Sequence, residues 1–142
     1  MLLIDVNFGT CIQNNCGIAR PRESLSNTRV ILGVDDEAAA LAVRCLLLSS
    51  AGYEVLTAAD GAAALEIFRS IQVDLVITDY RLPRLTGTQL AAEMKRLKPA
   101  VPIVLFSGLV EAPLGSEHAD LVMTKGMPPV EFLGEIGKLI QN

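Results

Sequence analysis

Several apolar runs of the chain end at side chains that could do chemistry. Asp35 and Asp36 follow the first of these runs, Asp79 and Ser107 follow two later ones, and Lys125 comes shortly after the last. Carboxylate oxygens are the ligands that Mg²⁺ prefers, and a carboxylate can also attack phosphorus. A lysine and a hydroxyl can neutralise or hydrogen-bond the transferred group. These residue types are together suited to metal-assisted phosphoryl transfer.

Five short apolar runs predict the strands that position these side chains. The predicted strands cover residues 30–34, 54–58, 73–78, 101–106 and 119–123. They alternate with amphipathic segments, which is typical of a parallel sheet with helices on both faces. Because parallel strands need crossover connections, we expect an open, doubly wound α/β sheet. Such sheets bind ligands beyond the carboxyl ends of their strands.

Apolar positions at helical spacing predict the helices between these strands. Leu41, Cys45 and Leu48 recur on one helical face after the first strand, and a similar pattern covers residues 90–97. Asp60 is suited to cap a shorter helix after the second strand. A double proline near the end of the chain marks the start of a closing helix.

Composition restricts the class of protein. The chain has 142 residues, of which 51% are hydrophobic, a size and composition that fit one globular domain. Its net charge is −4, only 4% of its residues are aromatic and it has no Trp, so we expect no direct contact with nucleic acid. No apolar stretch approaches the roughly 18–20 residues that span a bilayer, and no signal peptide is recognisable. We therefore expect no membrane contact and a cytoplasmic location.

The beginning of the chain differs from the remainder. Residues 1–28 mix polar residues, glycine and proline without periodicity, which predicts a flexible N-terminal arm before a folded domain over residues 29–142. The three cysteines are Cys11, Cys16 and Cys45. An odd number resembles no disulfide framework, and unpaired thiols in a reducing cytosol fit better than a metal or redox pair.

The combination of motifs resembles the receiver domain of two-component response regulators, and in particular a stand-alone, chemotaxis-regulator-like receiver. The resemblance covers residues 29–142 and depends on the order and spacing of several motifs. They are Val34-Asp35-Asp36-Glu37, Asp60-Gly61, Asp79-Tyr80-Arg81-Leu82-Pro83 with Gly87, Ser107-Gly108 and Thr124-Lys125. The family's fold implies a flavodoxin-like, five-stranded parallel sheet in the strand order 2-1-3-4-5.

The resemblance also implies a role for each acidic residue. Asp79 would accept a phosphoryl group from the phosphohistidine of a sensor histidine kinase or of a phosphotransfer protein. Asp36 would bind Mg²⁺ directly and Asp35 through water. Asp79 and the backbone carbonyl of Arg81 would complete the protein ligands of this cofactor.

Two further residues would serve the phosphorylated state. Ser107 would be the switch hydroxyl, and Lys125 would contact the acyl phosphate. The resemblance implies no enzyme in the ordinary sense, because the domain catalyses only its own phosphorylation and autodephosphorylation. Since the receiver accounts for residues 29–142, we expect a stand-alone receiver that signals by binding another protein.

The sequence departs from the family pattern near its C-terminal end. An aromatic residue usually stands three positions before the lysine, where this chain has Val122, and Gly126 follows the lysine where the family tends to have proline. The second departure predicts a looser placement of the lysine. Pro113 and Gly115 predict a short or irregular fourth helix, since both are unfavourable inside a helix. These departures predict altered signalling through the usual output face.

Two alternative functions remain open. The chain could be a receiver-like binding module that works without phosphorylation, which Val122 and the fourth helix motivate. It could also be a Mg²⁺-dependent aspartyl-phosphate phosphatase of the haloacid-dehalogenase type. Those enzymes carry a second aspartate two residues after the nucleophile, where this chain has Arg81. The lone His118 has no catalytic companion in sequence and is interpreted as a surface residue.

Overall fold

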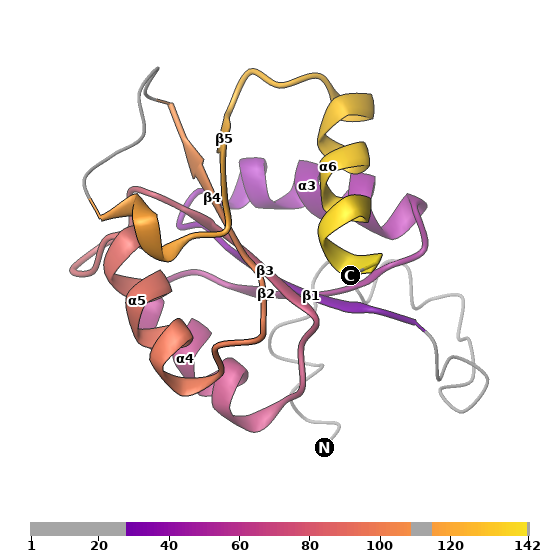
Figure 1. Ribbon diagram of the computed structural model, residues 1–142. Helices are drawn as coiled ribbons and strands as arrows, with labels where there is room; N and C mark the ends of the chain where they lie inside the picture. The colour runs from indigo at the N-terminus through magenta and orange to yellow at the C-terminus, as the bar shows by residue number, and fades with distance from the viewer. Residues whose placement is uncertain (1–27, 109–114, 142) are drawn as a thin grey trace.

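The computed structural model describes residues 28–108 and 115–141 of the chain. Within them, five parallel strands form one sheet in the order β2-β1-β3-β4-β5 (Figure 1). The strands are β1 (Val30–Val34), β2 (Glu54–Ala58), β3 (Leu75–Asp79), β4 (Ile103–Ser107) and β5 (Leu121–Thr124). The predicted doubly wound parallel sheet and its strand order are confirmed.

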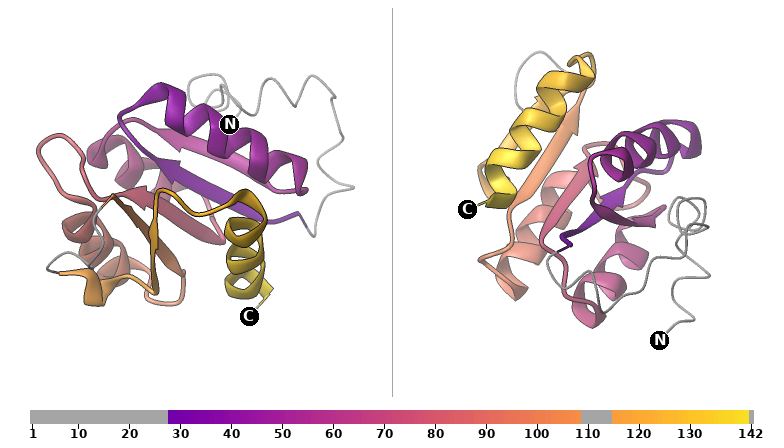
Figure 2. Two further views of the ribbon diagram at one scale, coloured as in Figure 1. Left: turned by 90° about the horizontal axis from the view of Figure 1, so that it is seen from above. Right: turned by 90° about the vertical axis from the view of Figure 1, so that its right-hand side faces the viewer.

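The described part of the chain contains four α-helices, which cover the sheet. They are α3 (Ala38–Ser50), α4 (Gly61–Ser70), α5 (Gly87–Leu97) and α6 (Pro129–Gln141). Helices α3 and α6 lie on one face of the sheet, and α4 and α5 lie on the other (Figures 1 and 2). Helices on both faces were predicted from the unbroken apolar runs, and this prediction is confirmed. None of the helices in the described ranges has the length and apolar character that a bilayer span requires.

The strands are apolar on both faces because each face has its own buried layer. Ile31 of β1 belongs to the same buried cluster as Cys45 and Leu48 of α3. The next residue, Leu32, belongs to the cluster on the other face, together with Phe68 of α4. All five side chains are almost completely buried. A strand buried on both faces cannot alternate apolar with polar residues, so its sequence is a continuous apolar run.

Three strands begin later than predicted, and two aspartates explain part of the difference. The carboxylate of Asp74 accepts a hydrogen bond from the backbone N–H of Val30 at 2.8 Å, and the carboxylate of Asp120 accepts one from Ile103 at 2.7 Å. Each carboxylate thus takes a backbone donor that would otherwise bond to a neighbouring strand, and the regular ladder starts after the aspartate. At their carboxyl ends β3 and β4 are each one residue longer than predicted and include Asp79 and Ser107.

Side-chain caps fix the starts of α4 and α5. Asp60 accepts a hydrogen bond from the backbone N–H of Ala63 at 2.8 Å, which confirms the predicted cap. Thr86 and Gln89 form a capping box at the start of α5, in which each side chain bonds the backbone of the other residue. The sequence prediction missed this second cap, although threonine followed three positions later by glutamine is its usual signature.

The connection between β4 and β5 agrees with the predicted irregular fourth helix as far as the structure describes it. Its described residues form one short 3₁₀ helix, η2 (Ser116–His118), which follows Gly115 in the left-handed region at φ 88°. His118 is exposed on this turn, as predicted. Residues 109–114 lie outside the described residues, and so does almost all of the predicted N-terminal arm with Cys11 and Cys16.

Candidate functional site

Three carboxylates meet at the carboxyl edge of the central strands. Asp35 and Asp36 follow β1, and Asp79 is the last residue of β3, which pairs with β1. One carboxylate oxygen from each of the three lies within 4.8 Å of the others. The sheet topology therefore brings together the acidic residues that the sequence analysis selected.

The first aspartate is held by the protein itself. Asp35 is 1% exposed, and its Oδ1 accepts a hydrogen bond from the backbone N–H of Glu37 at 2.9 Å. Its Oδ2 lies 2.5 Å from Nη2 of Arg44, a residue of α3. Asp36, in contrast, is exposed, with no ion pair or hydrogen bond to another described residue. Of the pair, Asp36 has the carboxylate that is more accessible to an incoming cation.

A lysine supplies positive charge to the third carboxylate. Nζ of Lys125 lies 2.7 Å from Oδ1 of Asp79. The Asp79 side chain is 5% exposed, whereas that of Lys125 is 40% exposed, so the ion pair reaches from the buried strand end to the surface. Apart from this ammonium contact, Oδ1 has no hydrogen-bond donor within the described residues. Oδ1 is therefore charge-paired but still able to accept a further ligand.

Ser107 and Lys125 are joined through the backbone. Ser107 ends β4 and is buried, and its carbonyl oxygen accepts a hydrogen bond from the backbone N–H of Lys125 at 3.2 Å. Both residues line a pocket of about 270 Å³ together with Asp79, Tyr80, Arg81 and Gly108. Ser107, Lys125 and Asp79 thus line one cavity.

The loop after β3 is closely packed against the strand end. The backbone N–H of Gly87 donates a hydrogen bond to the carbonyl oxygen of Tyr80 at 2.8 Å. A Cβ atom on Gly87 would lie 2.3 Å from the carbonyl oxygen of Asp79, so no larger residue fits there without moving the backbone. This packing sets the direction in which the chain leaves Asp79. Arg81, which lines the pocket, is exposed.

The donor set suits a hard divalent cation. All three candidate side chains offer carboxylate oxygens, which Mg²⁺ and Ca²⁺ prefer to nitrogen or sulfur ligands. Oδ1 of Asp79 lacks a hydrogen-bond donor among the described residues, which is consistent with an oxygen that a cation could approach. Asp36 and Asp79 fit direct ligands, while Asp35, whose two oxygens both have protein partners, fits a more indirect contact.

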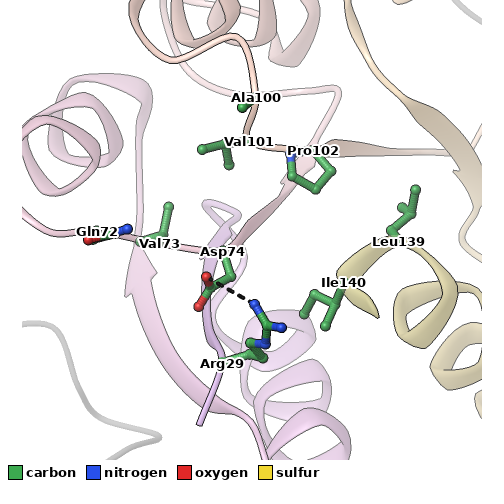
Figure 3. A pocket seen from close by; sticks show the side chains of 9 residues that line it. All are labelled: Arg29, Gln72, Val73, Asp74, Ala100, Val101, Pro102, Leu139 and Ile140. Atoms are coloured by element: carbon green, nitrogen blue, oxygen red, sulfur yellow. Dashed lines mark ion pairs between the residues drawn. The ribbon is translucent and has the colours of Figure 1, made fainter. Parts of the chain in front are cut away.

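A larger pocket lies at the opposite edge of the sheet (Figure 3). It measures about 490 Å³, and the C-terminal end of α6 and the segments that lead into β1, β3 and β4 line it. Its charged side chains, Arg29 and Asp74, point toward each other and form an ion pair of 3.7 Å. Asp74 also holds the start of β1, as described above. Both groups are thus engaged at the ends of strands, because they pair with each other and Asp74 also bonds the backbone of β1.

The structure shows where the residues that depart from the family pattern lie. Val122 is half-buried in β5, opposite Leu105 of β4. Lys125 reaches Asp79 although Gly126 follows it, so the expected looser placement does not prevent the ion pair. The described residues contain no cis peptide bond.

One residue at the site was missed by the sequence analysis. Arg44 lies inside the apolar pattern of α3, and a single arginine among helical apolar residues usually marks the solvent face. Its side chain instead is 11% exposed and contacts Asp35. The sequence offered one signal that Arg44 is partly buried, because Arg44 stands next to Cys45 of the apolar helix face, and Cys45 is buried. No sequence pattern, however, connects this position in the helix to an aspartate after the preceding strand.

The chain is similar in sequence to parts of known transcriptional regulators. The transcriptional regulatory protein GlrR of Escherichia coli (strain K12) is 39% identical over 77 residues, which cover 54% of this chain and 17% of GlrR. The alkaline phosphatase synthesis transcriptional regulatory protein PhoP of Bacillus subtilis (strain 168) is 32% identical over 116 residues, which cover 79% of this chain and 48% of PhoP. The chain thus spans less than half the length of each of these two relatives.

A solved structure and a family profile agree with these relatives. The response regulator protein TrrA from Thermotoga maritima, in complex with Mg²⁺-BeF, superimposes with a TM-score of 0.75 at 32% identity. The match covers 79% of this chain and 99% of TrrA. Residues 31–127 match the profile of the response regulator receiver domain. The chain therefore belongs to the response regulator receiver domain family.

Proposed function

We propose that this receiver domain accepts a phosphoryl group on Asp79 and that Mg²⁺ assists the transfer. The donor is the phosphohistidine of a sensor histidine kinase or of a phosphotransfer protein. The phosphorylated domain then binds a downstream protein, which carries the signal onward. The transfer is the domain's own reaction, and we propose no separate substrate that it turns over.

The observation that carries this proposal is the position of Asp79 between positive and negative groups. Its carboxylate lies in a cluster of three acidic side chains and within 2.7 Å of the lysine ammonium. Placing a third carboxylate beside two others is electrostatically unfavourable, because like charges in one site repel. This placement is therefore better explained by a function in binding a cation or a phosphoryl group than by stability. The complex of the similar protein TrrA with Mg²⁺-BeF further supports a magnesium site in this fold.

The chain's own residues supply the remaining chemistry. A carboxylate oxygen of Asp79 forms a bond to phosphorus while the bond between phosphorus and the donor's imidazole nitrogen breaks, and that nitrogen retains the electron pair. Lys125 offers positive charge on one side of the transferred group, and Ser107 offers a hydroxyl from the end of β4. Mg²⁺, when bound, neutralises negative charge on the phosphoryl oxygens.

The presence of an arginine at position 81 argues against a phosphatase of the haloacid-dehalogenase type. That chemistry needs a general acid two residues after the nucleophile. Arginine keeps its proton throughout the physiological pH range and cannot serve in that role. Arg81 lines the pocket as a cation instead, where it can attract the phosphorylated donor.

A small-molecule phosphodonor tests the proposal without knowledge of the kinase. The protein is incubated with acetyl phosphate or phosphoramidate and Mg²⁺, and its intact mass is measured. We expect one phosphoryl adduct on the wild type and none on Asp79→Asn. Asp60→Asn is the matched control, because asparagine caps a helix as well as aspartate does and Asp60 lies outside the acidic cluster.

Three results would contradict the proposal or a part of it. An unmodified wild type under conditions that phosphorylate another receiver would favour a binding module that works without phosphate. An adduct that persists in Asp79→Asn would place the modification on a different residue. Loss of the wild-type adduct when Mg²⁺ is removed with a chelator is the expected result for a metal-assisted transfer, and an undiminished adduct would contradict the metal's role.

A further inference from the structure

Arg44 makes a contact that the phosphoryl transfer itself does not require. Its guanidinium extends from α3 to the acidic cluster, where Nη2 lies 2.5 Å from Oδ2 of Asp35. We propose that Arg44 is a positioning residue that competes with the divalent cation for Asp35 and thereby lowers the affinity of the cluster for Mg²⁺. The inference rests on the proposed function, because it concerns the same metal site.

Stability alone does not account for an arginine at this position. The Arg44 side chain is 11% exposed, and its Nη1 is buried without a hydrogen-bond partner among the described residues. A buried ion pair is rarely more stabilising than apolar side chains of similar volume. A buried donor without a partner adds a further cost. The pair is therefore better explained by what it does to Asp35 than by a gain in folding energy.

An aromatic ring contacts the guanidinium of Arg44, and a second ring supports the first. Arg44 lies over the ring of Phe106, with 4.7 Å between its Cζ atom and the ring centroid. Phe106 is itself stacked on Phe132 of α6, with 5.5 Å between ring centroids. Since the cation would lose both the ring and the carboxylate by moving into solvent, Arg44 is a fixed charge beside the cluster rather than a mobile surface side chain.

A fixed positive charge at this point lowers the affinity of the acidic cluster for a divalent cation. Three carboxylates are placed together, and two cations already contact them, Arg44 at Asp35 and Lys125 at Asp79. Arginine cannot lose its proton to make room for the metal. An incoming Mg²⁺ is therefore repelled by the guanidinium at short range and finds Oδ2 of Asp35 already occupied. The metal binds more weakly than it would to the same carboxylates without Arg44.

The test is the affinity for Mg²⁺ alone, measured by amide chemical-shift titration of the whole chain. Arg44→Met keeps an unbranched apolar stem without charge, and Arg44→Gln keeps a donor for Asp35 without charge. We expect both variants to bind Mg²⁺ about tenfold more tightly or better, as the loss of a nearby like charge implies. Arg44→Lys, which keeps the charge, should stay close to the wild type. Arg96→Met is the matched control, because Arg96 is exposed on α5 and pairs with Glu93.

A second measurement separates affinity from folding. Thermal unfolding without metal should show a lower Tm for Arg44→Met, because Asp35 loses its buried partner. The rise in Tm on adding Mg²⁺ should be larger in this variant than in the wild type. At a fixed concentration, a ligand that binds with a lower Kd stabilises the folded protein more. Arg44→Gln, which keeps a hydrogen bond, provides the same comparison if Arg44→Met folds poorly.

The outcomes distinguish this inference from the proposed function. Measurable Mg²⁺ binding by the wild type, with equal or weaker binding by Arg44→Met and Arg44→Gln, would overturn the role of Arg44 and leave the metal site intact. Binding by neither the wild type nor any variant would overturn the metal site and the inference with it. Tighter binding by Arg44→Lys as well would show that shape rather than charge is responsible, and would also overturn the inference.

Discussion

Nζ of Lys125 lies 2.7 Å from Oδ1 of Asp79, although the two residues come from strands that do not pair with each other. Asp79 ends β3 and Lys125 follows β5, and β4 lies between them. The lysine side chain therefore reaches across the end of β4, above Ser107. The contact exists because parallel strands bring their carboxyl ends to one edge of the sheet, whatever their separation in the sequence.

Removing this lysine should weaken both folding and phosphorylation. In Lys125→Met, Asp79 remains buried without its cation, and we expect a loss of about 1–3 kcal/mol in the free energy of unfolding without metal. Phosphorylation by acetyl phosphate should slow by about a hundredfold or more, since a charge that stabilises the transferred group is gone. Urea unfolding and the time course of the intact mass measure the two effects.

Lys138→Met is the control for this prediction. Lys138 is exposed on α6, and its Nζ lies 3.4 Å from a carboxylate oxygen of Glu135. Because an exposed ion pair contributes about 0–1 kcal/mol, its loss should change the free energy of unfolding very little. An equal effect of both substitutions would show that Lys125 also acts as an ordinary surface charge.

The two adjacent aspartates should respond differently to the same substitution. Asp35→Asn leaves Arg44 buried beside a neutral group, so we expect a loss of about 2 kcal/mol or more in metal-free stability. Asp36→Asn changes an exposed side chain and should stay within about 0.5 kcal/mol. The stabilisation by Mg²⁺, in contrast, should be lost mainly in Asp36→Asn. Denaturant unfolding with and without Mg²⁺ gives both quantities, and equal metal-free stabilities of the two variants would contradict the prediction.

The sequence was sufficient to predict the sheet but not the limits of its strands. Apolar runs such as residues 73–78 are typical of strands buried on both faces, so the fold class followed from the pattern, and the strand order from the family resemblance. The limits depend on hydrogen bonds that a pattern does not contain. Asp74 and Asp120 bond the backbone of neighbouring strands, and β3 and β5 begin just after these aspartates.

The same distinction applies to the site. Asp35, Asp79 and Lys125 could be selected because each stands at the end of an apolar run, and the topology determines that such ends meet. Arg44 could not be selected in this way. Its role depends on the direction of one helical side chain, which its contacts with Asp35 and Phe106 determine. Phe106 is distant from Arg44 in the sequence, and no periodic pattern connects Arg44 to Asp35.

The cap of α4 provides a test of local stability apart from the site. Asp60 accepts a hydrogen bond from the backbone N–H of Ala63, one of the first donors of the helix. Asp60→Ala should lower the free energy of unfolding by about 1 kcal/mol, whereas Asp60→Asn should leave it nearly unchanged. Urea unfolding measures both. A comparable loss in Asp60→Asn would mean that the charge of Asp60 matters more than the cap.

Two glycines should respond to alanine in opposite directions. At Gly87 a Cβ atom would lie 2.3 Å from the backbone carbonyl oxygen of Asp79, which a side-chain movement cannot relieve, and 2.8 Å from Cδ1 of Leu105. The backbone must shift at the very strand end that carries the phosphoacceptor, so Gly87→Ala should cost about 3 kcal/mol or more and slow phosphorylation as well. Gly134 lies inside α6, and a Cβ there would contact nothing within 4 Å.

Gly134→Ala should therefore stabilise the protein by about 0.5–1 kcal/mol, because alanine restricts the unfolded chain and favours the helix. Denaturant unfolding of both variants, together with the acetyl phosphate reaction, makes the comparison. If Gly87→Ala retained wild-type stability, the loop between β3 and α5 would have to be able to move away from Asp79. The close packing that directs the chain away from the phosphoacceptor would then not be required for its position.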